Sequence, residues 1–207
     1  MTTFSDPLAV ARYAEGPVKQ VPGFLALQQM AALLLAEAVP DDGRVLVLGA
    51  GGGLELKVFA DAHAGWRFVG VDPSAPMLAL AQATLGPQAG RVDLHEGYVD
   101  SAPSGPFDAA TCLLTLHFLA ADERLHTLKE LRRRLKPGAP LVVAHHSFAQ
   151  TAREKKRWLD RVCGVRGGLW HSGGQRQECQ RGNQCPASAI DARRRRRAAA
   201  RSRFRIG

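Results

Sequence analysis

The sequence predicts an α/β protein with a doubly wound, parallel sheet. Three observations predict it. Short apolar segments alternate with helical segments between residues 44 and 144, a glycine-rich turn at Gly49–Gly53 follows the first apolar segment, and an acid, Asp72, ends the second. Strands that alternate with helices require right-handed crossovers and a parallel sheet. A glycine turn between a strand and a helix is typical of a nucleotide site.

Each element is predicted from its local pattern. Apolar residues recur at three- and four-residue spacing between Phe24 and Ala38, after a break at Pro22-Gly23. The segment 44–48 is apolar on both faces, as a central parallel strand should be. Pro76 in a first turn and Gly86-Pro87 at an end bound a further helix. The remaining expected elements are helix 54–62, strand 66–71, helix 74–85, strand 92–95, strand 107–114, helix 122–135, strand 140–144 and a helix from residue 151.

Helix 122–135 carries two further predictions. Its leucines at positions 125, 128, 131 and 135 are expected to share one face. Arg132, Arg133 and Arg134 are expected to form a solvated face with favourable charge at the helix C-terminus, rather than a nucleic-acid contact.

Charge divides the chain into two parts. Residues 1–161 hold 17 Lys/Arg and 17 Asp/Glu, so the formal net charge of +9 comes from residues 162–207. Those residues show neither helical nor strand periodicity, and they include the run Arg193–Arg197. We therefore expect a domain at 1–161 with an N-terminal helical segment, and a basic tail of low order at 162–207.

Targeting signals are not evident in the sequence. The N-terminus lacks a basic region, and no apolar run reaches the roughly 18 residues that cross a membrane. The expected location is cytoplasmic, with no membrane partner.

The glycine turn discriminates between nucleotides. Gly49, Gly51 and Gly53 fit the pattern G-x-G-x-G, whereas a dinucleotide fingerprint that begins at Gly49 needs glycine where Leu54 stands. Leu54 therefore counts against NAD and FAD. Asp72 lies 19 residues after Gly53, where an acid in this type of fold accepts hydrogen bonds from ribose hydroxyls.

With these motifs, residues 20–150 resemble the class I S-adenosylmethionine-dependent methyltransferases. The resemblance implies a Rossmann-like methyltransferase sheet with S-adenosylmethionine as cofactor. It also implies a β6–β7 hairpin after the fifth strand, and residues after Ser147 show no such strands, so we expect the hairpin to be absent. The motifs that carry the resemblance are residues 45–53 (VLVLGAGGG), 69–78 (VGVDPSAPML), 107–110 (FDAA) and 135–143 (LKPGAPLVV).

The resemblance also implies the residues that bind the cofactor. The glycine loop would face the methionine part, Asp72 would hold the ribose hydroxyls, and Leu114 and Thr115 would lie near the methyl group. Residues beside the adenine would come from two loops. The full set implied is Gly49, Ala50, Gly51, Gly52, Gly53, Asp72, Pro73, Met77, Gly97, Tyr98, Val99, Leu114 and Thr115.

Two positions depart from the family pattern. The family usually has an acid two residues before the first glycine, where this chain has Val47. Glu55 or a water-mediated contact is a possible replacement. The residue after Gly97 is often an acid that binds the adenine amine, and here it is Tyr98.

Catalytic and metal-ligating residues are not expected. Because a sulfonium is a good leaving group, proximity and orientation supply much of the catalysis of methyl transfer. His117 and His145-His146 follow the fourth and fifth strands, where a substrate-side base or contact is possible. Adjacent histidines in a strand point to opposite faces, which disfavours a shared metal. Cys112 is expected in the core.

The tail suggests a change of reading frame. Read one base later, permitted codons for the Arg run encode acids in a capped helix start, and residues 162–166 can continue the helix from residue 151. We hypothesise an insertion or deletion near codon 162, which the nucleotide sequence would decide. Loss of the native C-terminus would leave the fifth strand as an exposed edge and impair activity.

The predicted function is therefore S-adenosylmethionine-dependent methyl transfer to a small molecule. The alternatives are an NAD-dependent or other nucleotide-binding α/β enzyme, and a nucleic-acid-binding protein that uses the Arg-rich tail. A non-catalytic remnant that binds cofactor is also open. The acceptor atom and the oligomeric state are not predicted.

Overall fold

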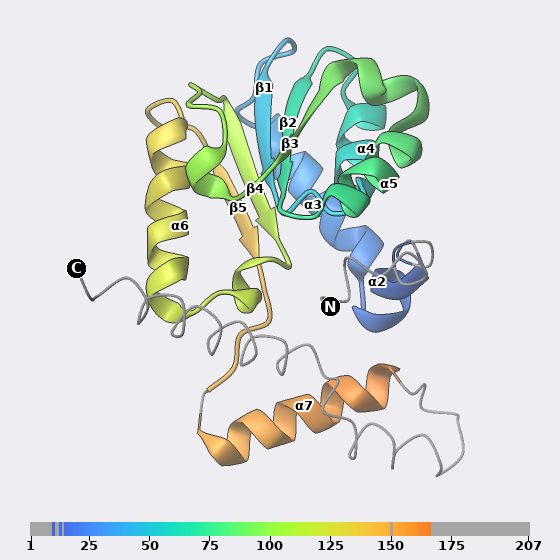
Figure 1. Cartoon of the computed structure of the whole chain (residues 1–207), viewed down its shortest axis with the longest axis vertical. Coiled ribbons are helices and arrows are strands. Elements are labelled where there is room, and N and C mark those ends of the chain that lie inside the picture. Colours follow the sequence, from blue (N-terminus) through green and yellow to red (C-terminus); the bar gives the residue numbers. More distant parts are fainter. Residues whose placement is uncertain (1–9, 11–12, 14, 150, 167–207) are drawn as a thin grey trace, which may run out of the picture. The chain divides into compact units, whose positions relative to one another are not determined.

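The computed structural model describes residues 10, 13, 15–149 and 151–166 (Figure 1). The chain forms two compact units, Met1–His146 and Ser147–Gly207. The described part of the second unit contains helix α7 (Ala152–Arg166), which passes the end of regular structure predicted at Arg161. The predicted domain boundary and the frame hypothesis stay predictions, since residues 167–207 lie outside the described residues.

The first unit is built on a parallel sheet, as predicted. Its strands have the order β3-β2-β1-β4-β5, and every pairing is parallel. The chain therefore runs from β1 through β2 to β3 at one edge of the sheet, and then returns to β4 and continues to β5 at the other edge. This is the doubly wound arrangement. The strands are β1 (Arg44–Leu48), β2 (Arg67–Asp72), β3 (Val92–Glu96), β4 (Ala109–Leu113) and β5 (Leu141–Ala144).

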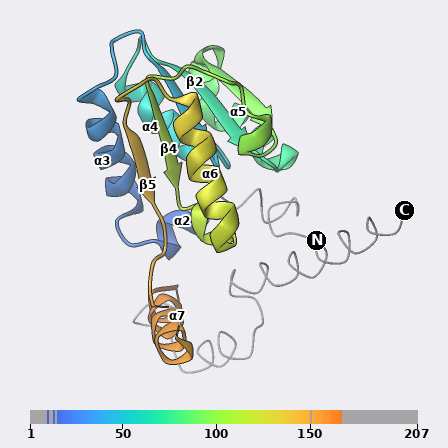
Figure 2. The ribbon, with the colours of Figure 1, turned by 90° about the vertical axis from the view of Figure 1, so that its left-hand side faces the viewer.

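Helices cover both faces of this sheet. Helices α3, α4 and α5 are neighbours on one face, and α6 covers the other face beside β4 and β5 (Figure 2). The α-helices of this unit are α2 (Glu15–Gln20), α3 (Phe24–Ala36), α4 (Leu54–Ala62), α5 (Ala75–Leu85) and α6 (Ala121–Arg134). Short 3₁₀ turns are η2 (Gly86–Arg91), η3 (Val99–Ser101) and η4 (Leu116–Phe118).

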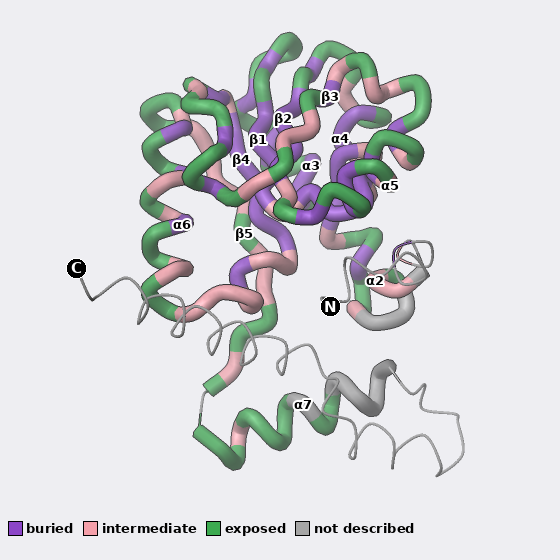
Figure 3. Tube along the Cα trace, in the orientation of Figure 1, coloured by how far each residue is buried: buried purple, intermediate pink, exposed green. Residues whose placement is uncertain are grey.

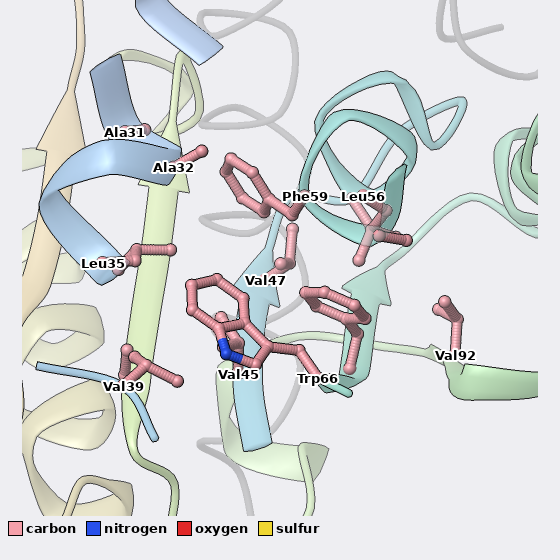
Figure 4. Packing of buried hydrophobic residues seen from close by; sticks show 14 of the residues in the cluster. Ala31, Ala32, Leu35, Val39, Val45, Val47, Leu56, Phe59, Trp66 and Val92 are labelled. Carbon is pink, nitrogen blue, oxygen red and sulfur yellow. The ribbon is translucent and has the colours of Figure 1, made fainter. Parts of the chain in front are cut away.

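Alternation along β1 divides the core into two clusters. Val45 and Val47 face α3 and α4, where Leu35 and Phe59 are also fully buried (Figure 4). Leu46 and Leu48 belong to the opposite cluster, which contains Leu131 of α6. Strands β2, β1 and β4, in the middle of the sheet, are largely buried (Figure 3). Each fully buried side chain of this size contributes about 1.5–3 kcal/mol.

Strand β5 is the last strand in the described part of the chain, and it lies at an edge of the sheet. Its residues are half-buried, and Val143 is exposed. The predicted absence of a following hairpin involves residues outside the described part and stays a prediction.

One prediction about α6 is wrong. The buried stripe of this helix runs through Thr127, Leu131 and Arg134, whereas Leu125 is 57% exposed. Arg134 is 1% exposed and so does not belong to a solvated face, although Arg132 and Arg133 are exposed as predicted.

Candidate functional site

The predicted cofactor residues lie at one edge of the sheet. In a parallel sheet all the carboxyl ends of the strands meet at the same edge, and each predicted residue ends a strand or follows one. That these residues bind a cofactor stays a prediction. Residues 49–53 follow β1, residues 72, 73 and 77 end or follow β2, residues 97–99 follow β3, and residues 114 and 115 follow β4.

The glycine loop is fastened to β2 and packed against the end of β4. The N–H groups of Gly49 and Ala50 both donate to the carbonyl of Val71, at 2.8 and 3.0 Å. Gly49 has φ 84°, and a Cβ atom at this position would overlap the side chain of Thr115. Only glycine fits both the left-handed backbone and this close approach. The loop therefore meets Thr115, as its assignment to the same site predicts.

Asp72 is held by two backbone donors. Its Oδ2 accepts from the N–H of Gly51 at 3.0 Å, and its Oδ1 accepts from the N–H of Ser74 at 2.9 Å. Burial raises the pKa of the carboxyl group, and the two hydrogen bonds oppose that shift. Because each carboxylate oxygen has two lone pairs, one on each oxygen is left after these bonds. The arrangement fits a pair of neighbouring ribose hydroxyls.

The segments after β2 and β3 lie against this carboxylate and the loop. The N–H of Gly97 donates to the carbonyl of Asp72 at 3.0 Å. Met77 is buried, and its Cε lies 3.5 Å from the place where a Cβ of Gly51 would be. Pro73 and Tyr98 are exposed, whereas Val99 packs into the core on the α6 side. The predicted adenine-side residues therefore differ in accessibility.

Glu55, which the sequence offers as one replacement for the acid missing at Val47, is buried beside β4. Val47 is buried and lies in register with Thr111 of β4. The Oγ1 of Thr111 donates to Oε1 of Glu55, in the first turn of α4, at 2.8 Å. Burial raises the pKa of Glu55 to about 8, and the hydrogen bond from Thr111 opposes the shift. A mostly protonated carboxyl group therefore lies beneath the glycine loop.

Tyr13 is a site residue that the sequence alone did not indicate. Its Oη lies 2.8 Å from the place of a Cβ on Gly51, and its ring lies equally close to Gly52. Burial raises the pKa of the phenol to about 12, with further contributions from the nearby carboxyl groups of Glu55 and Asp72. The phenol stays protonated at neutral pH. One signal was present, because Tyr13 is one of two tyrosines in the chain.

Arg134 supports the loop after β3. Its guanidinium donates to the carbonyls of Asp100 and Ala102, at 3.2 Å in each case, and pairs with Glu130 at 2.6 Å. These acceptors explain its burial, since a buried guanidinium requires carbonyl and carboxylate partners. The i, i+4 spacing of Glu130 and Arg134 in a predicted helix was the sequence feature from which this ion pair could have been predicted.

The end of β4 turns sharply toward a group of histidines. Leu114 has φ 53°, and its N–H donates to the carbonyl of Ala144 at 2.6 Å. In η4 the ring of His117 then meets that of His146, with centroids 4.7 Å apart and planes at 72°. Burial lowers the pKa of His117 to about 4, with further contributions from His146, His145 and Arg124.

Other candidate features lie elsewhere or have structural roles. Cys112 is fully buried, as predicted, and burial raises the pKa of its thiol to about 12. A surface pocket lined by Asp41, His63 and Trp66 lies near the start of β2, at the opposite edge from the glycine loop. Among the described residues, no group of three or more His, Cys, Asp or Glu side chains has the arrangement of a metal site. None of the helices in the described ranges is both long and apolar enough to cross a membrane.

Fold and site together define a doubly wound α/β domain with a glycine loop and a fixed carboxylate at one edge, and known proteins offer a comparison. Residues 45–138 match the family model described as "Methyltransferase domain". This match and the relatives below support the class I S-adenosylmethionine-dependent methyltransferase family that the sequence motifs predicted, with S-adenosylmethionine as its cofactor. The NAD and nucleic-acid alternatives receive no support.

Similar proteins agree with this assignment. A carboxy-S-adenosyl-L-methionine synthase of Chromohalobacter salexigens is 27% identical over 158 residues, which are 74% of this chain and 58% of that protein. A methyltransferase of Thiobacillus denitrificans, solved with S-adenosyl-L-homocysteine, has a TM-score of 0.56 at 20% identity, over 70% of this chain and 58% of that one. DesVI of Streptomyces venezuelae has a TM-score of 0.55 at 23% identity, over 70% of this chain and 60% of that one. This chain spans less than two thirds of the length of each.

Proposed function

We propose that this protein transfers a methyl group from S-adenosylmethionine to a small molecule. The observation that carries the proposal is the carboxylate of Asp72. It is fixed by the N–H groups of Gly51 and Ser74 and keeps one lone pair on each oxygen. It lies beside a glycine loop in a domain of the methyltransferase family.

The residues would act mainly by binding and orientation. When bound, S-adenosylmethionine supplies an activated methyl group on a sulfonium. Asp72 would accept hydrogen bonds from the ribose hydroxyls, and the glycine loop would hold the methionine part under the phenol of Tyr13. Thr115, which packs against Gly49, would face the methyl group. Fixing the donor in this way lets proximity lower the barrier without a catalytic acid or base.

The small-molecule substrate is inferred from charge. Residues 1–161 carry equal numbers of basic and acidic groups, so they have no net positive charge of the kind typical of nucleic-acid-binding domains. We propose a cytoplasmic location on the sequence alone.

Calorimetric titration tests the cofactor. The protein should bind S-adenosylmethionine and S-adenosylhomocysteine, and NADH should not compete. Asp72→Ala should weaken binding by about 1–3 kcal/mol, because two hydrogen bonds from buried hydroxyls are lost. Asp93→Ala is the matched control, since Asp93 is an exposed aspartate on the neighbouring strand β3. Equal binding by the two variants would overturn the assignment of Asp72.

A labelling experiment tests the acceptor class. Protein is incubated with S-adenosylmethionine carrying a labelled methyl group and with three fractions of a cell extract: small molecules, proteins and nucleic acids. The label should enter the small-molecule fraction. Transfer to protein or nucleic acid instead would contradict the substrate class while leaving the cofactor intact.

A further inference from the structure

The histidines at the ends of β4 and β5 have no role in the cofactor site. His117 lies in η4, two residues after Thr115, which touches the glycine loop. His145 and His146 directly follow β5, at the same edge of the sheet. This three-histidine cluster therefore stands beside the place where the methyl group would be, on the side away from Asp72.

The cluster has unused hydrogen-bonding capacity. Within the described residues, the Nδ1 atoms of His117 and His145 are buried and have no hydrogen-bond partner. An unpaired buried polar atom costs about 1–3 kcal/mol, and such atoms are uncommon unless a ligand or water pairs with them. His146 is exposed, so the cluster can be reached from solvent.

The charge around the cluster has one sign. The groups that lower the pKa of His117, besides burial, are His146 and His145 after β5 and Arg124 of α6. Each is cationic when charged, and no carboxylate acts on His117 among the described residues. The Nε of Arg124 donates to the carbonyl of Leu119 at 2.9 Å, which holds this cation near η4. Protonation of His117 is unfavourable beside these cationic groups, and a bound anion would make it more favourable.

We propose that the three-histidine cluster binds the methyl acceptor as an oxyanion, a carboxylate or a phenolate, and that His117 takes up a proton when the acceptor binds. The proposal rests on the proposed function and names its substrate chemistry. An amine acceptor would bring a cation to a site where, among the described residues, no carboxylate acts on His117.

The reaction balances without a further reagent. The acceptor oxygen forms a bond to the methyl carbon while the bond from methyl to sulfur breaks, and the sulfur keeps the electron pair. The negative charge of the acceptor and the positive charge of the sulfonium cancel. The products are a methyl ester or ether and a neutral thioether. The proton on His117 returns to solvent when the uncharged product leaves.

Histidine NMR with ring-¹⁵N labelling measures the proton uptake directly. The chain has seven histidines, so variants can assign each signal. Benzoate and S-adenosylhomocysteine are the probes. In their presence the titration midpoint of His117 should rise by about 1–3 units, as expected for an opposite charge within hydrogen-bonding distance. The affinity for benzoate should increase as the pH is lowered from about 7.5 to about 5.5, because binding takes up a proton.

4-Nitrophenol separates the phenolate from the carboxylate, because only its phenolate form absorbs visible light. If phenolates are accepted, the apparent pKa of the bound probe should fall by about one unit or more. Benzoate binding without nitrophenolate binding would restrict the acceptor to carboxylates. Failure of both probes to shift His117 would overturn the proposal.

Variants and cofactor binding make the outcomes distinguishable. His146→Asn should reduce the probe-dependent shift of His117, and His117→Asn should abolish the pH dependence of benzoate affinity. Both variants should retain affinity for S-adenosylhomocysteine. His126→Asn is the matched control, because His126 is an exposed histidine of α6 that pairs with Asp100. If wild-type protein fails to bind S-adenosylhomocysteine, the proposed function fails. If it binds S-adenosylhomocysteine and the probes leave His117 unchanged, only the histidine proposal fails.

Discussion

The two halves of the carboxyl edge are built in different ways. The glycine side, at the ends of β1 and β2, uses backbone N–H groups and the carboxylate of Asp72. The histidine side, at the ends of β4 and β5, uses side chains that are distant in sequence, with His117 against His146. A backbone site requires particular residues at fixed local spacing, whereas a side-chain site requires only that the fold bring suitable groups together.

The largest expected effect tests whether the glycine side is self-sufficient. Arg134→Met should lower the free energy of unfolding by about 3–5 kcal/mol, because it removes the buried donor of two backbone carbonyls and one of the two cations that pair with Glu130. Urea denaturation measures this value. Hydrogen exchange should also increase in residues 97–102, the loop that Arg134 holds.

Arg133→Met is the control for Arg134→Met, since Arg133 pairs with the same Glu130 from an exposed position. It should change stability little. If both variants behave alike, the loop after β3 does not depend on α6, and the glycine side is independent of the other half.

The next effect concerns the contact where the two sides meet. Gly49→Ala combines left-handed strain of about 1–2 kcal/mol with overlap of Thr115, which adds about 1–3 kcal/mol. Gly23→Ala carries the strain alone, because Gly23 is left-handed, with φ 73° and ψ 17°, and has open space around it. The difference between the two variants in urea denaturation measures the Gly49–Thr115 contact. A difference of zero would show that the loop and β4 are not tightly packed.

A last test changes the pH and involves Glu55, which links the glycine side to β4 through Thr111. Because its pKa is raised to about 8 in the folded protein, the folded state holds a proton that the unfolded state loses near pH 4.5. Wild-type stability should therefore be complete below that pH and fall as the pH rises toward 8, by at most about 1.4 kcal/mol per unit.

Glu55→Gln keeps the acceptor for Thr111 and should remove this pH dependence. Its stability relative to wild type should increase between about pH 5 and about pH 8. Glu37→Gln, at an exposed glutamate after α3, should retain the wild-type profile. Parallel curves for wild type and Glu55→Gln would show that Glu55 is ionised in the folded state.

Prediction from sequence succeeded where local constraints decide the structure. Helix α4 and strand β1 begin and end at the predicted residues, because a glycine loop separates a fully apolar strand from a helix. Helix α6 was placed correctly but its buried face was not. Leucines at helical spacing suggested one stripe, while the buried face includes Thr127 and Arg134, whose partners come from distant segments.

The same limit applies to the site. The sequence placed Gly49–Gly53 and Asp72 at one edge because their spacing encodes that arrangement. It left Tyr13 out, because nothing local shows that a tyrosine before the first strand lies over Gly51. It identified Glu55 only as a possible substitute, since the bond to Thr111 joins residues 56 positions apart. The approach of His117 to His146 likewise depends on the pairing of β4 with β5.

Leu114 limits which sequences can join the two sides. Its left-handed backbone, with φ 53°, turns the chain between Thr115 and the end of β4. Glycine and asparagine adopt this conformation readily, whereas valine and isoleucine rarely do. Mutational tolerance at this position should therefore follow backbone handedness rather than hydrophobicity. A scan of all substitutions should favour Gly and Asn over Val and Ile, although the natural residue is a large aliphatic one.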